Sequence, residues 1–299
     1  ENGNGGKGLG SFMCNGTGKW QITARSSMPI KIMGLIRTPD GFLTGLTDVV
    51  PVESGSNIFY FANPASNTVQ QTFLRVVNNS AIQSGRVTIT AIDDLGIAAT
   101  GSVSFSLMEN SSKQMTAQDL ENGNEAKGLT GKFGDGTGKW RLKIASGRDI
   151  SAQSLIRTPD GFLTNLSAVV TPDKKGLSTL NFFNPASNTA QQSFMRLINS
   201  GTEESYITIS GVDDDGQVAP NGDVSLLLAA GQSVELSAKD LEQGNAALSI
   251  RGSLGIGSGR WRLAVSHNIE SQISVMSYVL TSTGFLTNMS EVVGAASTT

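Results

Sequence analysis

Trp140-Arg141-Leu142-Lys143-Ile144 alternates between apolar and charged side chains. An alternation with a period of two is typical of a β-strand that has one buried face and one face in water. The same alternation follows the other two tryptophans of the chain, Trp20 and Trp261. The pattern predicts three equivalent strands, each of which carries a tryptophan into a hydrophobic core rather than onto a sugar-binding surface.

The tryptophans belong to an internal repeat. Their spacings are 140−20 = 120 and 261−140 = 121 residues. The segment Ile36–Thr44 recurs unchanged at Ile156–Thr164, and the motif Asn-Pro-Ala-Ser-Asn-Thr occurs at both 63–68 and 184–189. A period of this length is too long for a solenoid repeat and fits one compact domain.

Each period has one half with the tryptophan and one half with the Asn-Pro motif. The chain holds three of the former and two of the latter. Proline and charged residues interrupt the pattern at 51–55 and 171–176, as is typical of linkers. We therefore predict the C-terminal half of a β-sandwich repeat at 1–50, followed by complete repeats at 51–170 and 171–299. Glycine-bearing loops also separate the two halves within a period, so composition leaves the opposite phase open.

Turn signals such as Pro-Asp-Gly separate the alternating segments. Their spacing of roughly ten residues predicts an all-β chain made of short antiparallel strands in β-sandwiches. The run Phe194–Asn199, followed by Ile207–Ile209 and Asp214–Gly216, resembles the opening of immunoglobulin-like repeats in exported bacterial proteins. The segments Gly138–Leu142 and Gly161–Ser167 resemble the closing strands of such repeats. The resemblance implies tandem Ig-like domains in an extracellular or cell-surface protein, and it implies no particular chemistry.

Composition excludes two classes of partner. The 22 Lys and Arg residues are balanced by 25 Asp and Glu residues and form no basic run, so nucleic acid is not an expected partner. No stretch approaches the roughly 18 consecutive apolar residues of a membrane span. The first ten residues are polar and rich in glycine, so we expect no signal peptide among them. The resemblance to the bacterial repeats implies an exported protein, whose signal would then not be in this chain.

Cys14 and His267 are the only cysteine and the only histidine. These counts exclude an intrachain disulfide, a cysteine-based zinc site and a centre with several histidine ligands. No nucleophile motif accompanies His267. We therefore expect no enzymatic activity and no cofactor.

Two acidic turns are candidate metal sites. Asp93 and Asp94 end one predicted strand, and Asp213, Asp214 and Asp215 end its counterpart in the next repeat. Carboxylate oxygens at a tight turn are ligands that Ca²⁺ accepts. Asp and Gly also form hairpin turns without a metal, and the spacing of an EF-hand is absent. A plain turn is therefore the first expectation and a calcium site the alternative.

Phe42, Phe162 and Phe285 are the candidate ligand-binding residues. Each follows the same turn in its own repeat. An aromatic ring in this position can be exposed and stack on a sugar, whereas core packing is the alternative.

Two arginines, Arg75 and Arg196, lie in apolar strand sequence at equivalent positions. We expect each to form a structural ion pair with a carboxylate of its own domain. We expect Asn63 and Asn184, which precede prolines, to cap the local backbone.

The sequence therefore predicts a non-enzymatic structural or adhesive segment of an extracellular bacterial fibre, stalk or filament. Its expected partners are neighbouring repeats, other copies of itself, or surface glycans. Because a half-sandwich exposes a sheet edge, residues 1–50 are expected to be completed either by preceding repeats or by another chain, which would make filaments. The alternative function is a carbohydrate-binding accessory module of a secreted hydrolase.

Overall fold

The computed structural model describes residues 55–290, except 159, 170–175 and 269. Before residue 55 it describes only scattered positions: 19, 22, 27, 35–37, 43–45 and 50–52. The chain divides into two compact units, Glu1–Met33 and Gly34–Thr299. The fold described below is that of the second unit.

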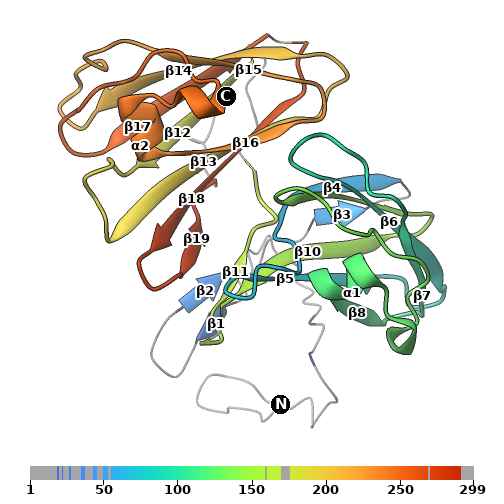
Figure 1. Ribbon diagram of the computed structural model, residues 1–299. Coiled ribbons are helices and arrows are strands. Elements are labelled where there is room, and N and C mark those ends of the chain that lie inside the picture. Colours follow the sequence, from blue (N-terminus) through green and yellow to red (C-terminus); the bar gives the residue numbers. More distant parts are fainter. Residues whose placement is uncertain are drawn as a thin grey trace, which may run out of the picture. The chain divides into compact units, whose positions relative to one another are not determined.

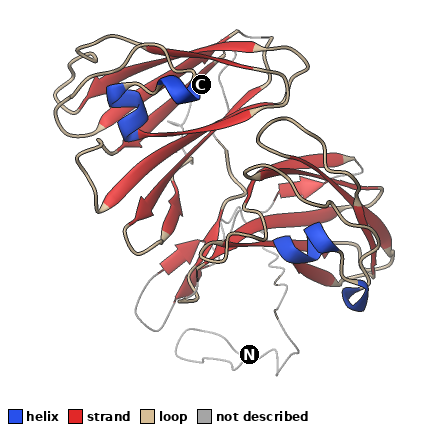
Figure 2. Ribbon diagram, viewed as in Figure 1, coloured by secondary structure: helices blue, strands red, loops and turns tan. Residues whose placement is uncertain are grey.

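Nearly all the regular structure is β-sheet, and every strand pair within the described residues is antiparallel (Figures 1 and 2). The exceptions are short: the α-helices α1 (Ala117–Asn122) and α2 (Ala238–Gln243), and the 3₁₀ turns Glu125–Lys127 and Ala246–Leu248. The prediction of an all-β, antiparallel chain is confirmed.

The first sheet pair contains the strands β3 to β11. One sheet has the order β4-β9-β6-β7. The other has the order β11-β10-β5-β8, with β3 also paired to β10. Buried apolar side chains from both sheets, including Phe59, Leu74 and Trp140, form one core between them. The strands are β3 (Val50–Val52), β4 (Ser56–Ala62), β5 (Gln71–Asn78), β6 (Gly85–Ile92), β7 (Val103–Leu107), β8 (Ser112–Thr116), β9 (Trp140–Ser146), β10 (Ile150–Arg157) and β11 (Leu163–Asn165).

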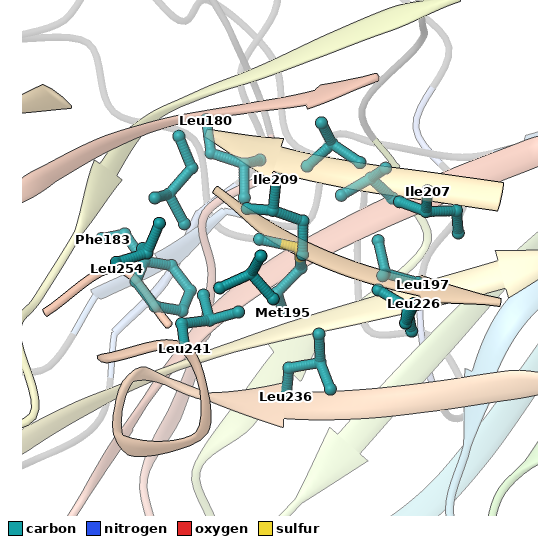
Figure 3. Packing of buried hydrophobic residues seen from close by; sticks show 14 of the residues in the cluster. Leu180, Phe183, Met195, Leu197, Ile207, Ile209, Leu226, Leu236, Leu241 and Leu254 are labelled. Carbon is teal, nitrogen blue, oxygen red and sulfur yellow. The ribbon is translucent and has the colours of Figure 1, made fainter. Parts of the chain in front are cut away.

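The second sheet pair repeats this arrangement with the orders β12-β17-β14-β15 and β16-β13-β18-β19. Figure 3 shows side chains from its two sheets and from α2 converging on one core, among them Leu180, Met195 and Leu241. The strands are β12 (Leu177–Phe183), β13 (Gln191–Asn199), β14 (Ser205–Asp213), β15 (Val224–Leu228), β16 (Ser233–Ser237), β17 (Trp261–His267), β18 (Ile273–Thr281) and β19 (Leu286–Asn288).

A separate hairpin precedes both sheet pairs. Its strands β1 (Leu35–Arg37) and β2 (Leu43–Gly45) pair Leu35 with Gly45. The hairpin of β10 and β11 has the same register, with Leu155 opposite Asn165. The unpaired copy of the repeat thus forms the same local structure as a complete one.

The order of the strands is that of a jelly roll. If β3 to β10 are counted from one to eight, one sheet holds strands one, eight, three and six, and the other holds two, seven, four and five. In an immunoglobulin domain the first two strands share a sheet, whereas the first two strands in this count, β3 and β4, lie in different sheets. The immunoglobulin-like strand order is therefore not the order observed. Alternation reports which face of a strand is buried, but it does not report which strand is its neighbour.

A buried glutamate connects the recurring motifs within the first sheet pair. Glu121, on α1, accepts a hydrogen bond from Trp140 Nε1 at 2.7 Å and from the backbone N–H of Ala65 at 3.0 Å. In the second sheet pair Glu242 accepts the same two bonds, from Trp261 at 2.9 Å and Ala186 at 3.1 Å. Both tryptophans are buried, as predicted. The motifs recur together because they form one hydrogen-bonded unit.

Candidate functional site

The most elaborate polar site in the described residues is the contact between the two sheet pairs, which we call the seam. One side is the docking face of the second sheet pair, formed by Arg196, Ser233, Glu235 and Tyr278. The other is the receiving face of the first sheet pair, formed by Phe61, Asp94, Gly96, Lys139 and Arg141.

Arg196 lies at the centre of the seam. It is on β13 and is fully buried. Its Nη2 forms an ion pair with Asp94 Oδ1 at 2.5 Å, and its Nε donates to the backbone carbonyl of Tyr60 at 3.0 Å. A guanidinium group stays charged, so its burial requires a compensating carboxylate. The predicted ion pair exists, but the carboxylate comes from the other repeat rather than from its own.

Asp94 lies in the loop that follows β6 and is held in place by the residue that precedes β9. Its Oδ2 accepts the backbone N–H of Lys139 at 2.8 Å, which leaves Oδ1 for Arg196. Its backbone carbonyl accepts the N–H of Ser233 at 3.0 Å from across the seam. Asp94 therefore binds the segment before β9 through Oδ2 and the docking face through Oδ1 and its backbone carbonyl.

Glycines allow the two backbones to approach each other. Gly96 has φ +84°, and a Cβ atom there would lie 3.0 Å from the carbonyl carbon of Gly231 and 3.1 Å from the carbonyl oxygen of Ala230. A side chain at position 96 would therefore push the two sheet pairs apart.

A second polar cluster surrounds Glu235. Its Oε2 forms an ion pair with Lys139 Nζ at 2.6 Å and accepts a hydrogen bond from the Tyr278 hydroxyl. The Tyr278 ring stacks on Phe194 and meets the ring of Phe61 edge-on, with centroids 5.5 Å apart in each case. Burial, followed by the negative charge of Glu235, raises the pKa of Tyr278 well above its usual value. The hydroxyl therefore remains a hydrogen-bond donor.

Arg141 adds a third polar contact. Its Nη1 donates to the backbone carbonyl of Asn199 at 2.8 Å and to Ser200 Oγ at 3.3 Å. Arg141 is buried. The alternation along β9, in which Trp140 and Leu142 face the core, predicts that Arg141 faces solvent. Arg141 departs from the strand alternation because the second sheet pair covers it.

The hairpin ends β11 and β19 also meet at the seam. Thr164 Oγ1 donates to the backbone carbonyl of Leu286 at 2.5 Å, and Asn288 Nδ2 donates to that of Ala168 at 3.2 Å. The rings of Phe162 and Phe285 pack here with centroids 4.7 Å apart, and Phe162 is only 6% exposed. The prediction of an exposed aromatic is therefore wrong for Phe162. Phe42, the third member of that prediction, lies outside the described residues.

Asp93 and Asp213 bind backbone N–H groups of their own turns and of the segments that precede β9 and β17. Asp93 accepts three backbone N–H groups, from Leu95, Ile97 and Thr137, at 2.9 to 3.0 Å. Asp213 does the same with Asp215, Gln217 and Ser258. The N–H groups of Ser258 and Gln217 hold the pKa of Asp213 below its usual value. In the described part of the chain, no group of three or more His, Cys, Asp or Glu side chains is placed to hold a metal ion.

The asparagines of the Asn-Pro motif cap the backbone, as predicted. Asn63 Nδ2 donates to the carbonyl of Gln70, and Asn184 Nδ2 donates to that of Gln191, both at 2.9 Å.

A surface hollow of about 620 Å³ lies elsewhere in the first sheet pair, and no aromatic side chain lines it. None of the helices among the described residues is long and apolar enough to cross a membrane.

Sequence reasoning missed the seam, although the sequence contains a signal for it. Asp94 and Arg196 each have a counterpart in the other repeat, Asp214 and Arg75. An arginine recurs at one strand position and an aspartate recurs at one turn position. Opposite charges that recur in this way indicate an ion pair that repeats from one junction between repeats to the next. The expected partner of Arg196 is a carboxylate of its own repeat, whereas the observed partner, Asp94, belongs to the other repeat.

The comparisons with known proteins are weak. A scan of protein-family models gives no match, and a search of curated proteins gives none. Among solved structures, the chain is similar to the PBSX exported protein XepA, with 8% identity over 87% of this chain and 100% of that chain, at a TM-score of 0.22. It is also similar to β-glucuronidase 2 of Bacteroides uniformis, with 11% identity over 78% of this chain and 25% of that chain, at a TM-score of 0.16. TM-scores this low do not establish a shared fold.

Proposed function

We propose that this chain is a non-enzymatic structural segment of an extracellular bacterial fibre, stalk or filament. Its two sheet pairs are tandem β-sandwich modules, 51–170 and 171–299, whose partners are neighbouring modules of the same kind. The observation that supports the proposal best is the buried ion pair between Arg196 and Asp94, which joins one module to the next.

The ion pair supports a mechanical role because it fixes how the two modules meet. Arg196 is enclosed and paired with Asp94 only when the two faces are in contact in this orientation, so other orientations would leave a buried guanidinium without its carboxylate. Most interfaces between domains of one chain permit relative motion unless they are large and well packed. Here the Glu235 cluster and the Arg141 hydrogen bonds surround the central pair. Such a seam suits a spacer that fixes the distance between its ends.

The N-terminal hairpin supports the second part of the proposal. The hairpin of β1 and β2 has the register of β10 and β11, which supports the proposal that residues 1–50 are the closing half of a further module. We propose that this half is completed by preceding repeats or by strands of another chain, and the second route would give self-assembly.

The test is small-angle X-ray scattering of the full chain at a dilution where it is monomeric. We expect Asp94→Arg, which places two guanidinium groups together, to increase the radius of gyration and broaden the distance distribution. The matched control is Asp214→Arg, the equivalent change on the second module, which we expect to leave both unchanged. A wild-type chain that already scatters as two independently moving modules would contradict the proposal.

The carbohydrate-binding alternative has lost one of its three aromatic residues, since Phe162 is buried. We expect no binding of the chain to an array of bacterial and host glycans. A glycan that binds and is released by Phe42→Ala would favour the alternative.

A further inference from the structure

The receiving face of the first sheet pair has a counterpart on the second. Strand register fixes the correspondence, because Ala62 lies opposite Trp140 just as Phe183 lies opposite Trp261. The residues equivalent to Phe61, Asp94, Gly96, Lys139 and Arg141 are then Phe182, Asp214, Gly216, Arg260 and Arg262.

This second face has the same internal geometry as the occupied one. Asp214 Oδ2 accepts the backbone N–H of Arg260 at 2.8 Å, the distance at which Asp94 accepts that of Lys139. The Arg260 guanidinium lies 5.1 Å from the centroid of Phe182. On the first sheet pair, the corresponding lysine lies 5.3 Å from the centroid of Phe61.

The second face is open where the first is filled. Asp214, Arg260 and Arg262 are exposed. A Cβ atom at Gly216 would meet nothing within 4 Å, whereas at Gly96 it would meet the docking face. Among the described residues, no group donates a hydrogen bond to Oδ1 of Asp214, the oxygen equivalent to the one that binds Arg196.

The first sheet pair carries a counterpart of the docking face. Arg75 lies opposite Gln114 on β8 and Gln153 on β10. Arg196 lies opposite the equivalent residues, Glu235 and Met276. Arg75 is half-buried, and its burial lowers its pKa. Within the described residues no carboxylate lies at ion-pair distance from Arg75.

We propose that the open face around Asp214 binds a second copy of this chain, whose Arg75 forms an ion pair with Asp214 Oδ1. The contact would repeat the central ion pair of the seam between molecules but not its hairpin contact, because β2 of the same chain already lies against β11. The proposal rests on the proposed function, in which the seam is the mode of module association. It joins two different surfaces, and a contact of that kind extends head to tail unless it closes into a ring.

The intermolecular contact is expected to be weaker than the seam. The first sheet pair has Gln114 in place of Glu235 and Leu155 in place of Tyr278. The tyrosine–glutamate–lysine cluster is therefore missing, and the central ion pair carries most of the specificity. Assembly would then be reversible and sensitive to the charges at positions 75 and 214.

Sedimentation velocity of the full chain over a concentration series tests the proposal. We expect the wild type to form species larger than the monomer as concentration rises. Arg75→Asp and Asp214→Arg should each weaken association about a hundredfold, as expected for a lost interfacial charge pair. The double variant should associate again. A mixture of the two single variants should also associate. One variant has aspartate at both positions and the other has arginine at both, so a contact between one molecule of each variant pairs opposite charges.

Asp215→Arg is the matched control, since this neighbour of Asp214 is exposed and makes the same change in net charge. If circular dichroism shows that Arg75→Asp does not fold, the proposal is still tested by comparing the association of Asp214→Arg with that of Asp215→Arg. A chain that stays monomeric at its highest soluble concentration, or Asp214→Arg that associates like Asp215→Arg, overturns the proposal. Neither result affects the scattering test of the internal seam, so the two proposals can fail separately.

Discussion

Arg196 and Asp94 form an ion pair at 2.5 Å although they lie 102 positions apart in the sequence and in different sheet pairs. The arginine is fully enclosed, while the aspartate keeps some contact with solvent. This asymmetry makes the aspartate the better residue to replace, because the charge left behind cannot be hydrated.

Asp94→Asn should destabilise the chain by about 3–5 kcal/mol, since it leaves the buried guanidinium without a counter-charge. Urea unfolding followed by tryptophan fluorescence measures the loss. Asp214→Asn, at the exposed equivalent position, should change the unfolding free energy by less than about 0.5 kcal/mol in monomeric protein. Equal losses at the two positions would show that the effect belongs to the turn rather than to the seam.

Gly96→Ala and Gly216→Ala form a second matched pair. Both glycines have positive φ, +84° and +78°, so both substitutions carry a conformational cost of about 1 kcal/mol. Only the alanine at 96 would also collide with the backbone of Gly231. We expect the greater loss of melting temperature at 96, measured by calorimetry. Similar losses would mean that the backbones are not in close contact.

The seam should weaken at alkaline pH. The pKa of Tyr278 is raised in the folded chain, so its contribution to stability is complete below the usual value of 10.0 and is lost as the pH rises above it. Urea unfolding at a series of pH values should show a falling free energy above that point. Tyr278→Phe should be less stable near neutrality but should lack this part of the slope. An unchanged slope would assign the alkaline loss to other groups.

Asp119 provides a test at acid pH. Burial acts to raise its pKa, but the ion pair with Lys127 and hydrogen bonds from Thr116 and Asn124 lower it to about 2 from 3.8. The lowered pKa of Asp119 contributes about 2 kcal/mol to the free energy of unfolding. This contribution is present above pH 3.8 and is lost as the pH falls toward 2.

Lys127→Leu copies the second repeat, where Leu248 stands at this position. The substitution should raise the pKa of Asp119 and move the acid limb of stability to higher pH. Carboxyl chemical shifts followed by NMR give the pKa directly. Asp240, the equivalent residue in the second sheet pair, should titrate as before, and a parallel shift there would point to a general effect of net charge.

Local features of this fold could be predicted from sequence, whereas its long-range pairings could not. Alternation around Trp140 and Trp261 identified buried strand faces because side-chain direction in a strand depends only on residue parity. The capping by Asn63 and Asn184 was equally local. The jelly-roll strand order, the partner of Arg196 and the burial of Phe162 depend on surfaces brought together from distant segments. Periodicity contains no information about such encounters.

The Glu235 cluster makes the two modules non-interchangeable. Tyr278 and Glu235 on one side require Lys139 on the other, and their counterparts Leu155 and Gln114 lack the charge and the hydroxyl that such a contact needs. A chain with the two sheet pairs in the opposite order would bring Arg75 to Asp214 at the junction but would lose the Glu235 cluster there. The two copies have thus diverged so that the docking face of the second sheet pair matches the receiving face of the first. This match favours one order of the two sheet pairs in the chain.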